Sequence, residues 1–104
     1  MSRYAGPVFA QFESETLSGV ITDPANAVVA GAEIRAINEA TNIESAAIND
    51  HEGRFAFTNL RPGSYRVTAI AKGFKEAVSP GVVLQVNQAA RLDMQLTTGN
   101  VTEQ

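Results

Sequence analysis

The chain of 104 residues has room for one domain and can close one apolar core without metal ions or disulfide bonds. The absence of cysteine excludes disulfides, thiolate metal sites and thiol nucleophiles together. A net charge of −3 with scattered Lys and Arg argues against nucleic-acid binding, and no apolar run approaches the roughly 20 residues that span a bilayer.

The N-terminal segment, residues 1–15, contains a stretch that is similar to a signal-peptidase site. In "GPVFAQ", residues 6–11, Val8 and Ala10 have the small or apolar character that such a site requires. Residues 1–6 lack the apolar region that normally precedes it. Two interpretations stay open: a remnant of a secretory signal peptide, or a chance likeness. The first predicts an exported protein of the periplasm or cell envelope.

Alternating apolar and polar residues predict seven short strands along the chain. Turn signals recur between them every 8–12 residues or so, which is typical of a β-sandwich. The inward face of the third strand is left open, because both of its phases are mixed. The predicted strands are residues 17–22, 32–38, 43–49, 54–58, 64–69, 81–86 and 89–97.

Each of the other six strands has one apolar face, which is predicted to point into the core. In the fifth strand, Ser64, Arg66 and Thr68 are predicted to face outward, away from the core. The predicted inward-facing residues are Leu17, Gly19, Ile21, Ala32, Ile34, Ala36, Phe55, Phe57, Tyr65, Val67, Ala69, Val82, Leu84, Val86, Ala90, Leu92, Met94 and Leu96.

Clusters of Asp, Asn, Pro and Gly mark the predicted turns. Residues 23–31, "DPANAVVAG", supply the first, and residues 50–53, "DHEG", supply another. In "LRPG", residues 60–63, Pro62 presets φ and Gly63 permits the positive φ of a type II turn. Residues 54–74 are therefore read as two core strands and the turn between them. Residues 98–104 are predicted to be a polar, frayed tail.

The one candidate for catalysis is His51, the only histidine, which lies beside Asp50 and Glu52. A hydrolase triad would need a Ser or Thr held against this ring and an oxyanion hole, and the sequence has no Gly-x-Ser-x-Gly elbow. The same stretch, Asn49 to Glu52, gathers oxygen and nitrogen donors but too few for a calcium loop. Turn chemistry explains these residues. No catalytic, cofactor-binding or metal-binding residue is predicted.

Three further possibilities concern single residues. An intramolecular Lys–Asn isopeptide bond needs a lysine in the first strand, whereas the only lysines are Lys72 and Lys75. A sugar site commonly uses an exposed aromatic ring, and Phe74 is the one ring expected near a strand end, although filling the core is the favoured role for it. Asn100, with Val101 and Thr102, fits a glycosylation sequon that matters only in a eukaryotic secretory route.

Taken together, these stretches resemble the carboxypeptidase regulatory-like domain over residues 16–97. The resemblance is carried by "LSGVITDPANAVVAGAEIRAIN", "INDHEGRFAFTNLRPGSYRVTAIAKGF" and "VVLQVNQAARLDMQL". It rests on many spaced features rather than on one motif. The matching features are Gly19, Gly31-Ala32, the turn from Asn49-Asp50 to Gly53, Phe55 and Phe57, Leu60 to Val67, and Gly73-Phe74.

The resemblance implies an all-β fold, a seven-stranded Greek-key β-sandwich that is transthyretin-like and related to starch-binding-like domains. The end of the chain, "VNQAARLDMQLTTGNVTEQ", looks like the boundary where such a domain leads into the plug of a TonB-dependent outer-membrane receptor. The 104 residues contain neither plug nor barrel, so the resemblance implies no transport by them.

The leading hypothesis is therefore a non-catalytic accessory domain at the N-terminus of an exported receptor-like protein. Its partner would be a protein, either the receptor plug or barrel or a periplasmic protein, bound through an exposed strand edge. Neither nucleic-acid binding nor membrane insertion by this chain alone is expected. The alternative is a carbohydrate-binding module, which rests on fold-group analogy alone.

Overall fold

The computed structural model describes residues 15–99, and within them every regular element is a β-strand. The signal-like stretch at residues 6–11 and the sequon at residues 100–102 lie outside the described residues. None of the described residues forms a helix, so no helical segment among them could cross a membrane. The strands are β1 (Glu15–Thr22), β2 (Glu33–Asn38), β3 (Glu44–Ile48), β4 (Arg54–Leu60), β5 (Gly63–Ile70), β6 (Ala77–Leu84), β7 (Ala89–Arg91) and β8 (Met94–Gln95).

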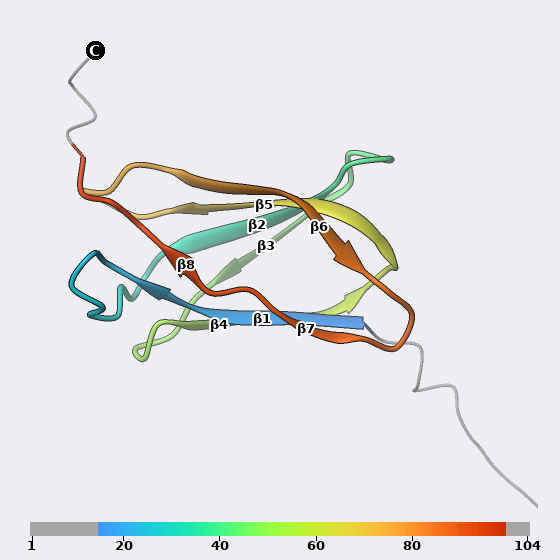
Figure 1. Cartoon of the computed structure of the whole chain (residues 1–104), viewed down its shortest axis with the longest axis horizontal. Coiled ribbons are helices and arrows are strands. Elements are labelled where there is room, and N and C mark those ends of the chain that lie inside the picture. Colours follow the sequence, from blue (N-terminus) through green and yellow to red (C-terminus); the bar gives the residue numbers. More distant parts are fainter. Residues whose placement is uncertain (1–14, 100–104) are drawn as a thin grey trace, which may run out of the picture.

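The strands form two sheets that face one another as a sandwich (Figure 1). One sheet has the order β4-β1-β7, with β8 also paired to β1, and the other has the order β3-β2-β5-β6. Every pairing is antiparallel except those of β1 with β7 and β8, which are parallel. The predicted all-β sandwich is confirmed, with eight strands in place of seven.

The core lies between the two sheets and is built from the predicted apolar faces. Burial alternates residue by residue along β1, and along β2 as far as Ile37, as the sequence pattern predicts. Phe55 and Phe57 of β4 are both buried, with ring centroids 6.0 Å apart in an edge-on arrangement. The buried apolar residues are Leu17, Ile21, Val29, Ala32, Ile34, Ala36, Phe55, Phe57, Leu60, Tyr65, Val67, Ala69, Leu84, Met94 and Leu96.

One predicted side-chain environment is wrong, and one outward-facing side chain is more buried than its position suggests. The sequence predicts an inward-facing Val86, but β6 ends at Leu84 and Val86 is 64% exposed, because the alternation of the sequence continues past the end of the strand. Thr68 faces outward as predicted and pairs with Arg35, yet it is only 6% exposed. Its short side chain stands on a face between longer neighbours on β2 and β6, so facing outward does not expose it.

The connection between β4 and β5 is not the predicted type II turn. Gly63 has φ +152°, well away from the value near +80° that such a turn needs, and it is already the first residue of β5. The two strands also belong to different sheets, so the chain crosses the sandwich here instead of forming a hairpin. Tyr65 stabilises the crossing, because its hydroxyl donates to the Arg61 carbonyl oxygen at 2.7 Å.

The last predicted strand, residues 89–97, is divided into β7 and β8 although its register against β1 does not change. Ser18 pairs with Arg91 and Ile21 pairs with Met94, at the same offset. In an unbroken parallel ladder the Val20 N–H would donate to the Leu92 carbonyl. It donates instead to Asp93 Oδ1 at 3.0 Å, and the Leu92 carbonyl oxygen lies 1.8 Å from the place where a Cβ on Gly19 would be. Gly19 thus makes room for the turned carbonyl, and Asp93 replaces the lost acceptor.

Candidate functional site

The turn at residues 49–53 contains the sequence candidates for catalysis and metal binding. Its hydrogen bonds hold the turn itself together. Asp50 Oδ1 accepts the N–H groups of Glu52 and Arg54 at 2.9 and 2.8 Å. The Asp50 N–H donates to the Arg54 carbonyl, and the Gly53 N–H donates to the Asp50 carbonyl. Within residues 15–99 no group of three or more His, Asp or Glu side chains lies close enough to hold a metal ion. The predicted turn chemistry is confirmed.

Asn49 is the first residue of this turn and is one of the few buried polar residues among those described, at 6% exposure. Its Oδ1 accepts the Ala32 N–H at 2.8 Å, and its Nδ2 donates to the Val29 and Gly53 carbonyls at 2.7 and 3.2 Å. One side chain therefore joins the turn at residues 50–53 to the loop that precedes β2. The role of Asn49 is to hold two connections together.

His51 lies exposed at the tip of the turn, and no hydrogen bond or ion pair joins its ring to another described residue. A nucleophile and its base must be within hydrogen-bond reach of one another. The described residues supply no such pair with His51.

The pKa of Asp50 is lowered, first by the hydrogen bond from the Arg54 backbone N–H and further by that of Glu52 and the nearby Arg54 charge. A carboxyl whose pKa is lowered by folding stabilises the protein above its ordinary pKa of about 4, and this contribution is lost as the pH falls through the lowered value. We expect Asp50→Ala to lower the urea midpoint at pH 7 by more than at pH 3, measured by circular dichroism. His51→Ala, the neighbouring control, should show a much smaller pH-dependent deficit, because the charge of His51 is the smallest of the causes that lower the pKa of Asp50. A deficit that is equal at both pH values would contradict the assignment.

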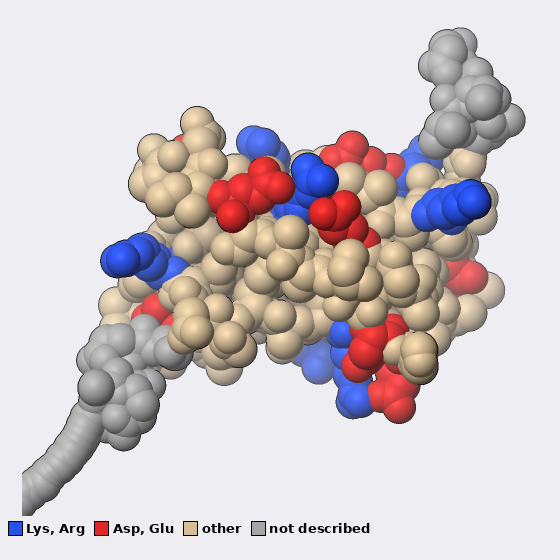
Figure 2. All heavy atoms as spheres, turned by 180° about the vertical axis from the view of Figure 1, so that it is seen from behind, with Lys and Arg blue, Asp and Glu red and all other residues tan. Residues whose placement is uncertain are grey.

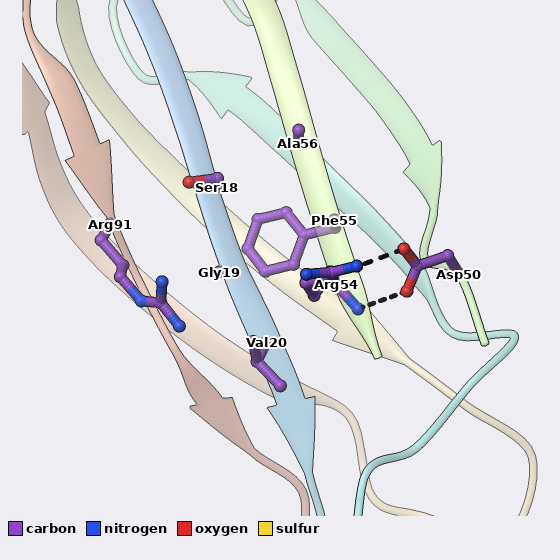
Figure 3. Close-up of a pocket in the computed structure, with 8 residues that line it drawn as sticks. All are labelled: Ser18, Gly19, Val20, Asp50, Arg54, Phe55, Ala56 and Arg91. Atoms are coloured by element: carbon purple, nitrogen blue, oxygen red, sulfur yellow. Dashed lines mark hydrogen bonds and ion pairs between the residues drawn. The ribbon is translucent and has the colours of Figure 1, made fainter. Parts of the chain in front are cut away.

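A recess of about 300 Å³ lies on the outer face of the β4-β1-β7 sheet (Figure 3). Small side chains form its floor, from Ser18 and Val20 on β1 and Ala56 on β4, while Arg54 and Arg91 stand on either side of β1. The cross-strand register places these residues together, because Ser18 pairs with both Ala56 and Arg91. We call this recess the arginine trough.

The two arginines of the trough differ in how many donors they leave available. Arg54 pairs with Asp50, with Nε 3.7 Å from Oδ2, and also with Glu52. Arg91 uses Nε for Asp93, at 3.1 and 3.3 Å from its two oxygens, and its terminal nitrogens contact no described acceptor. The terminal nitrogens of Arg91 and the Ser18 hydroxyl can donate hydrogen bonds to a polyol or an anionic group. None of the residues that line the trough is a histidine or cysteine.

The trough could not be found from the sequence, because its residues come from three strands that meet only in the folded sheet. Their outward phase is visible in the alternation of each strand, but the pairing of β1 with β7 is not. The sequence pattern predicts Asp93 only as an outward residue, and its bond to Val20 depends on the turned carbonyl beside Gly19.

The aromatic rings of the described residues do not form a platform for a sugar. Phe55, Phe57 and Tyr65 are buried, and Phe74 is half-buried and packed against the core. The interpretation of Phe74 as a core-filling ring is confirmed. It also pairs with Thr98, and the Gly99 N–H approaches the Gly73 carbonyl at 3.4 Å, so the first tail residues lie against this corner.

Charges are mixed on the face of the molecule that Figure 2 shows. Lys and Arg side chains alternate with Asp and Glu, and no broad field of one sign covers this face. Ion pairs such as that of Arg35 with Glu33 and Glu44, both at 3.3 Å, follow the same pattern. The pKa of Arg35 is raised, first by its hydrogen bond to Glu33 and then by the neighbouring carboxylates.

Solved structures similar to this chain share its fold at low sequence identity. Hydroxyquinol 1,2-dioxygenase from Pseudomonas putida has a TM-score of 0.63 at 12% identity, over 83% of this chain and 57% of that one. The Bacillus anthracis TIE protein has a TM-score of 0.69 at 20% identity, over 83% and 17%. A protein of Bacteroides uniformis, provisionally described as carbohydrate binding, has a TM-score of 0.65 at 15% identity, over 79% and 40%.

The chain thus spans less than two thirds of the length of each of these structures, and the likeness concerns the fold alone. No curated protein sequence matches the chain. The model of one protein family matches residues 16–97, which include all but the first residue of the described strands. The chain therefore belongs to the carboxypeptidase regulatory-like domain family.

Proposed function

We propose that this chain is a non-catalytic accessory domain that interacts with, or positions, the rest of a longer exported protein of the TonB-dependent receptor type. Membership of a family of regulatory-like domains supports a role outside catalysis. The likeness of residues 86–104 to the segment that leads into a receptor plug supports the receptor context. The partner is a protein of the cell envelope, either the receptor plug or barrel or a periplasmic protein.

The observation that carries the proposal is the parallel pairing of β1 with β7 and β8. The first and last strands run in the same direction side by side, so the chain enters β1 at one end of the sandwich and leaves β8 toward the opposite end (Figure 1). A domain with this path lies in line between its two neighbouring segments. Such an arrangement suits a spacer that sets the distance between them.

The experiment that tests the proposal uses the full reading frame in which the domain is encoded. Deletion of residues 16–97 is expected to leave the abundance of a receptor unchanged and to reduce its substrate-dependent growth or the recovery of its periplasmic partner. His51→Ala in the intact protein is the control and should change neither. A deletion without any effect, or a reading frame that encodes no receptor, would refute the receptor role, whereas loss of a measured activity in His51→Ala would revive a catalytic one.

Carbohydrate binding is a second candidate because the arginine trough offers free donors on an open sheet face. The likeness to the Bacteroides uniformis protein agrees with it, while the burial of the described aromatic rings argues against it. The test is a titration of the protein with oligosaccharides up to about 10 mM, well above the range of a specific site. Binding that is lost in Arg91→Ala and kept in Arg61→Ala would support it. If the titration shows neither binding heat nor chemical-shift changes up to that concentration, carbohydrate binding is excluded.

A further inference from the structure

Within residues 15–99 the two sheets leave four strand edges, and three of them carry features that hinder the pairing of a further strand. β6 contains Pro80, which has no N–H, and Gly81 at φ +69°, whose N–H donates to Glu39 Oε2 at 3.1 Å. β7 and β8 are three and two residues long and are separated by the irregular residues 92–93. Short and interrupted edges of this kind offer little backbone to a partner.

The edge of β4 is covered for part of its length by the turn that precedes it. The N–H and the carbonyl of Arg54, which point away from β1, both bond to Asp50, at 2.8 and 3.0 Å. At the other end, Asn59 has φ +67°, which bends the strand. About two residues of regular edge remain between these points, at Ala56 and Thr58.

The edge of β3 has none of these features. The strand is five regular residues, "ESAAI", without proline, glycine, lysine or arginine, and among the described strands it pairs only with β2. Two hydrogen bonds fix which backbone groups face β2: the Asn49 N–H donates to the Ala32 carbonyl at 3.1 Å, and the Asn38 N–H donates to the Ile43 carbonyl at 2.9 Å. Because bonding alternates along an antiparallel strand, the N–H and carbonyl groups of residues 44, 46 and 48 face the open edge.

We propose that β3 is the site at which two copies of this chain associate, as an antiparallel pair with its two-fold axis at Ala46. In this register Ala46 lies opposite the partner's Ala46, and Glu44 lies opposite the partner's Ile48. The groups of residues 44, 46 and 48 then form about six hydrogen bonds, two in each of three pairs. The two four-stranded sheets become one continuous eight-stranded sheet across the dimer.

The side chains of β3 favour a second copy as the occupant. The residues around the axis are small, Ser45, Ala46 and Ala47, so that nothing on either face holds the two strands apart. The only charged residue, Glu44, is already paired with Arg35 at 3.3 Å and would face an isoleucine. The two copies of Glu44 lie four residues apart, about 13 Å along the strand, so their repulsion is small.

Pairing would also cover apolar surface at the end of the strand. Ile48 is 66% exposed in the single chain, and opposite the partner's Glu44 it packs across the aliphatic part of that side chain. The contact is smaller than a standard protein interface, so the dimer is expected to be weak, with a Kd on the order of 100 µM. This dimer goes beyond the proposed function, because it is an association of the domain with a second copy and not with a receptor.

Sedimentation velocity of the full chain from about 10 to about 500 µM tests the proposal, a range that brackets the expected Kd. Wild type is expected to shift from monomer to dimer. Ala46→Lys and Ala46→Glu should each stay monomeric, because like charges then lie directly opposite one another across the axis, and their equimolar mixture should form a dimer again. Ala56→Lys, the same change on the β4 edge, is the control that should dimerise as wild type.

The outcomes separate the proposal from its competitors. Wild type that is monomeric at about 500 µM overturns it. Single Ala46 variants that dimerise as wild type, or a mixture that stays monomeric, overturn the two-fold register. A monomer whose Ala46 amide is protected from hydrogen exchange only when a receptor segment is added would assign the edge to a foreign strand instead. Circular dichroism of each variant verifies the fold. The result of deleting the domain from a receptor does not depend on dimerisation, so the dimer and the proposed function can be refuted separately.

Discussion

Gly19→Ala is expected to lower the free energy of unfolding by about 3 kcal/mol or more, although it adds a single methyl group. The new Cβ would lie 1.8 Å from the Leu92 carbonyl oxygen and 2.6 Å from its carbon. Both atoms belong to the backbone, so no side-chain rotation can relieve the contact. The Leu92 carbonyl would have to move away from Gly19. The hydrogen bond from Val20 to Asp93 and the pairing of β1 with β7 and β8 would then be lost.

Urea unfolding followed by circular dichroism measures this loss. Ser18→Ala is the matched control, because Ser18 is the next residue of β1 and points to the outer face; it should cost less than about 0.5 kcal/mol. Amide hydrogen exchange of residues 89–96 should rise in Gly19→Ala even under conditions where the remaining strands stay folded. A Gly19→Ala protein within about 1 kcal/mol of wild type would show that the Leu92 carbonyl is not fixed against Gly19.

Asn49→Ala is expected to cost about 3 kcal/mol, a large share of the stability of a domain of this size. The substitution leaves the Ala32 N–H and the Val29 carbonyl without their bonds in a buried place. Each such group costs about 1–3 kcal/mol when it loses its partner away from water. The third bond, to the Gly53 carbonyl, matters less because that carbonyl also accepts the Ile21 N–H at 2.9 Å.

Gln95→Ala provides the control for Asn49→Ala. Its side chain makes one exposed hydrogen bond to the Asp23 carbonyl at 3.2 Å, and its loss should cost less than about 1 kcal/mol. Asn49→Asp distinguishes the bonds from the packing, because it keeps the shape but places a carboxylate before two carbonyls. Its deficit should therefore shrink as the pH falls and the carboxyl becomes protonated. Equal stability of Asn49→Ala and Gln95→Ala would contradict the role given to Asn49.

The parts of the fold that depend on local pattern could be predicted from the sequence. The phases of β1, β2 and β4 are correct, since one buried face imposes a period of two on Leu17, Ile34 and Phe57 alike. The turn at Asp50 could also be predicted, because its side chain bonds to residues two and four positions ahead. These interactions lie within a few residues of one another, where composition is informative.

Features that depend on distant strands could not be predicted. Pro62 and Gly63 look like a hairpin turn, and only the pairing of β4 with β1 and of β5 with β2 shows that the chain crosses between sheets. The interruption at Leu92 depends on Gly19, on a strand at the other end of the sequence. The arginine trough and the open edge of β3 have the same origin, because a site made by strand order is absent from any single stretch.

The parallel ladder between the first and last strands has a mechanical consequence. Tension applied to the two ends of the domain would pull β1 and β7–β8 in opposite directions along their length. The hydrogen bonds of the ladder, including the Val20 bond to the Asp93 carboxylate, would then share the load and have to break together. A hairpin pulled from its open end yields one bond at a time at low force. A domain arranged in this way is expected to stay folded under a pull along β1 that would open a hairpin.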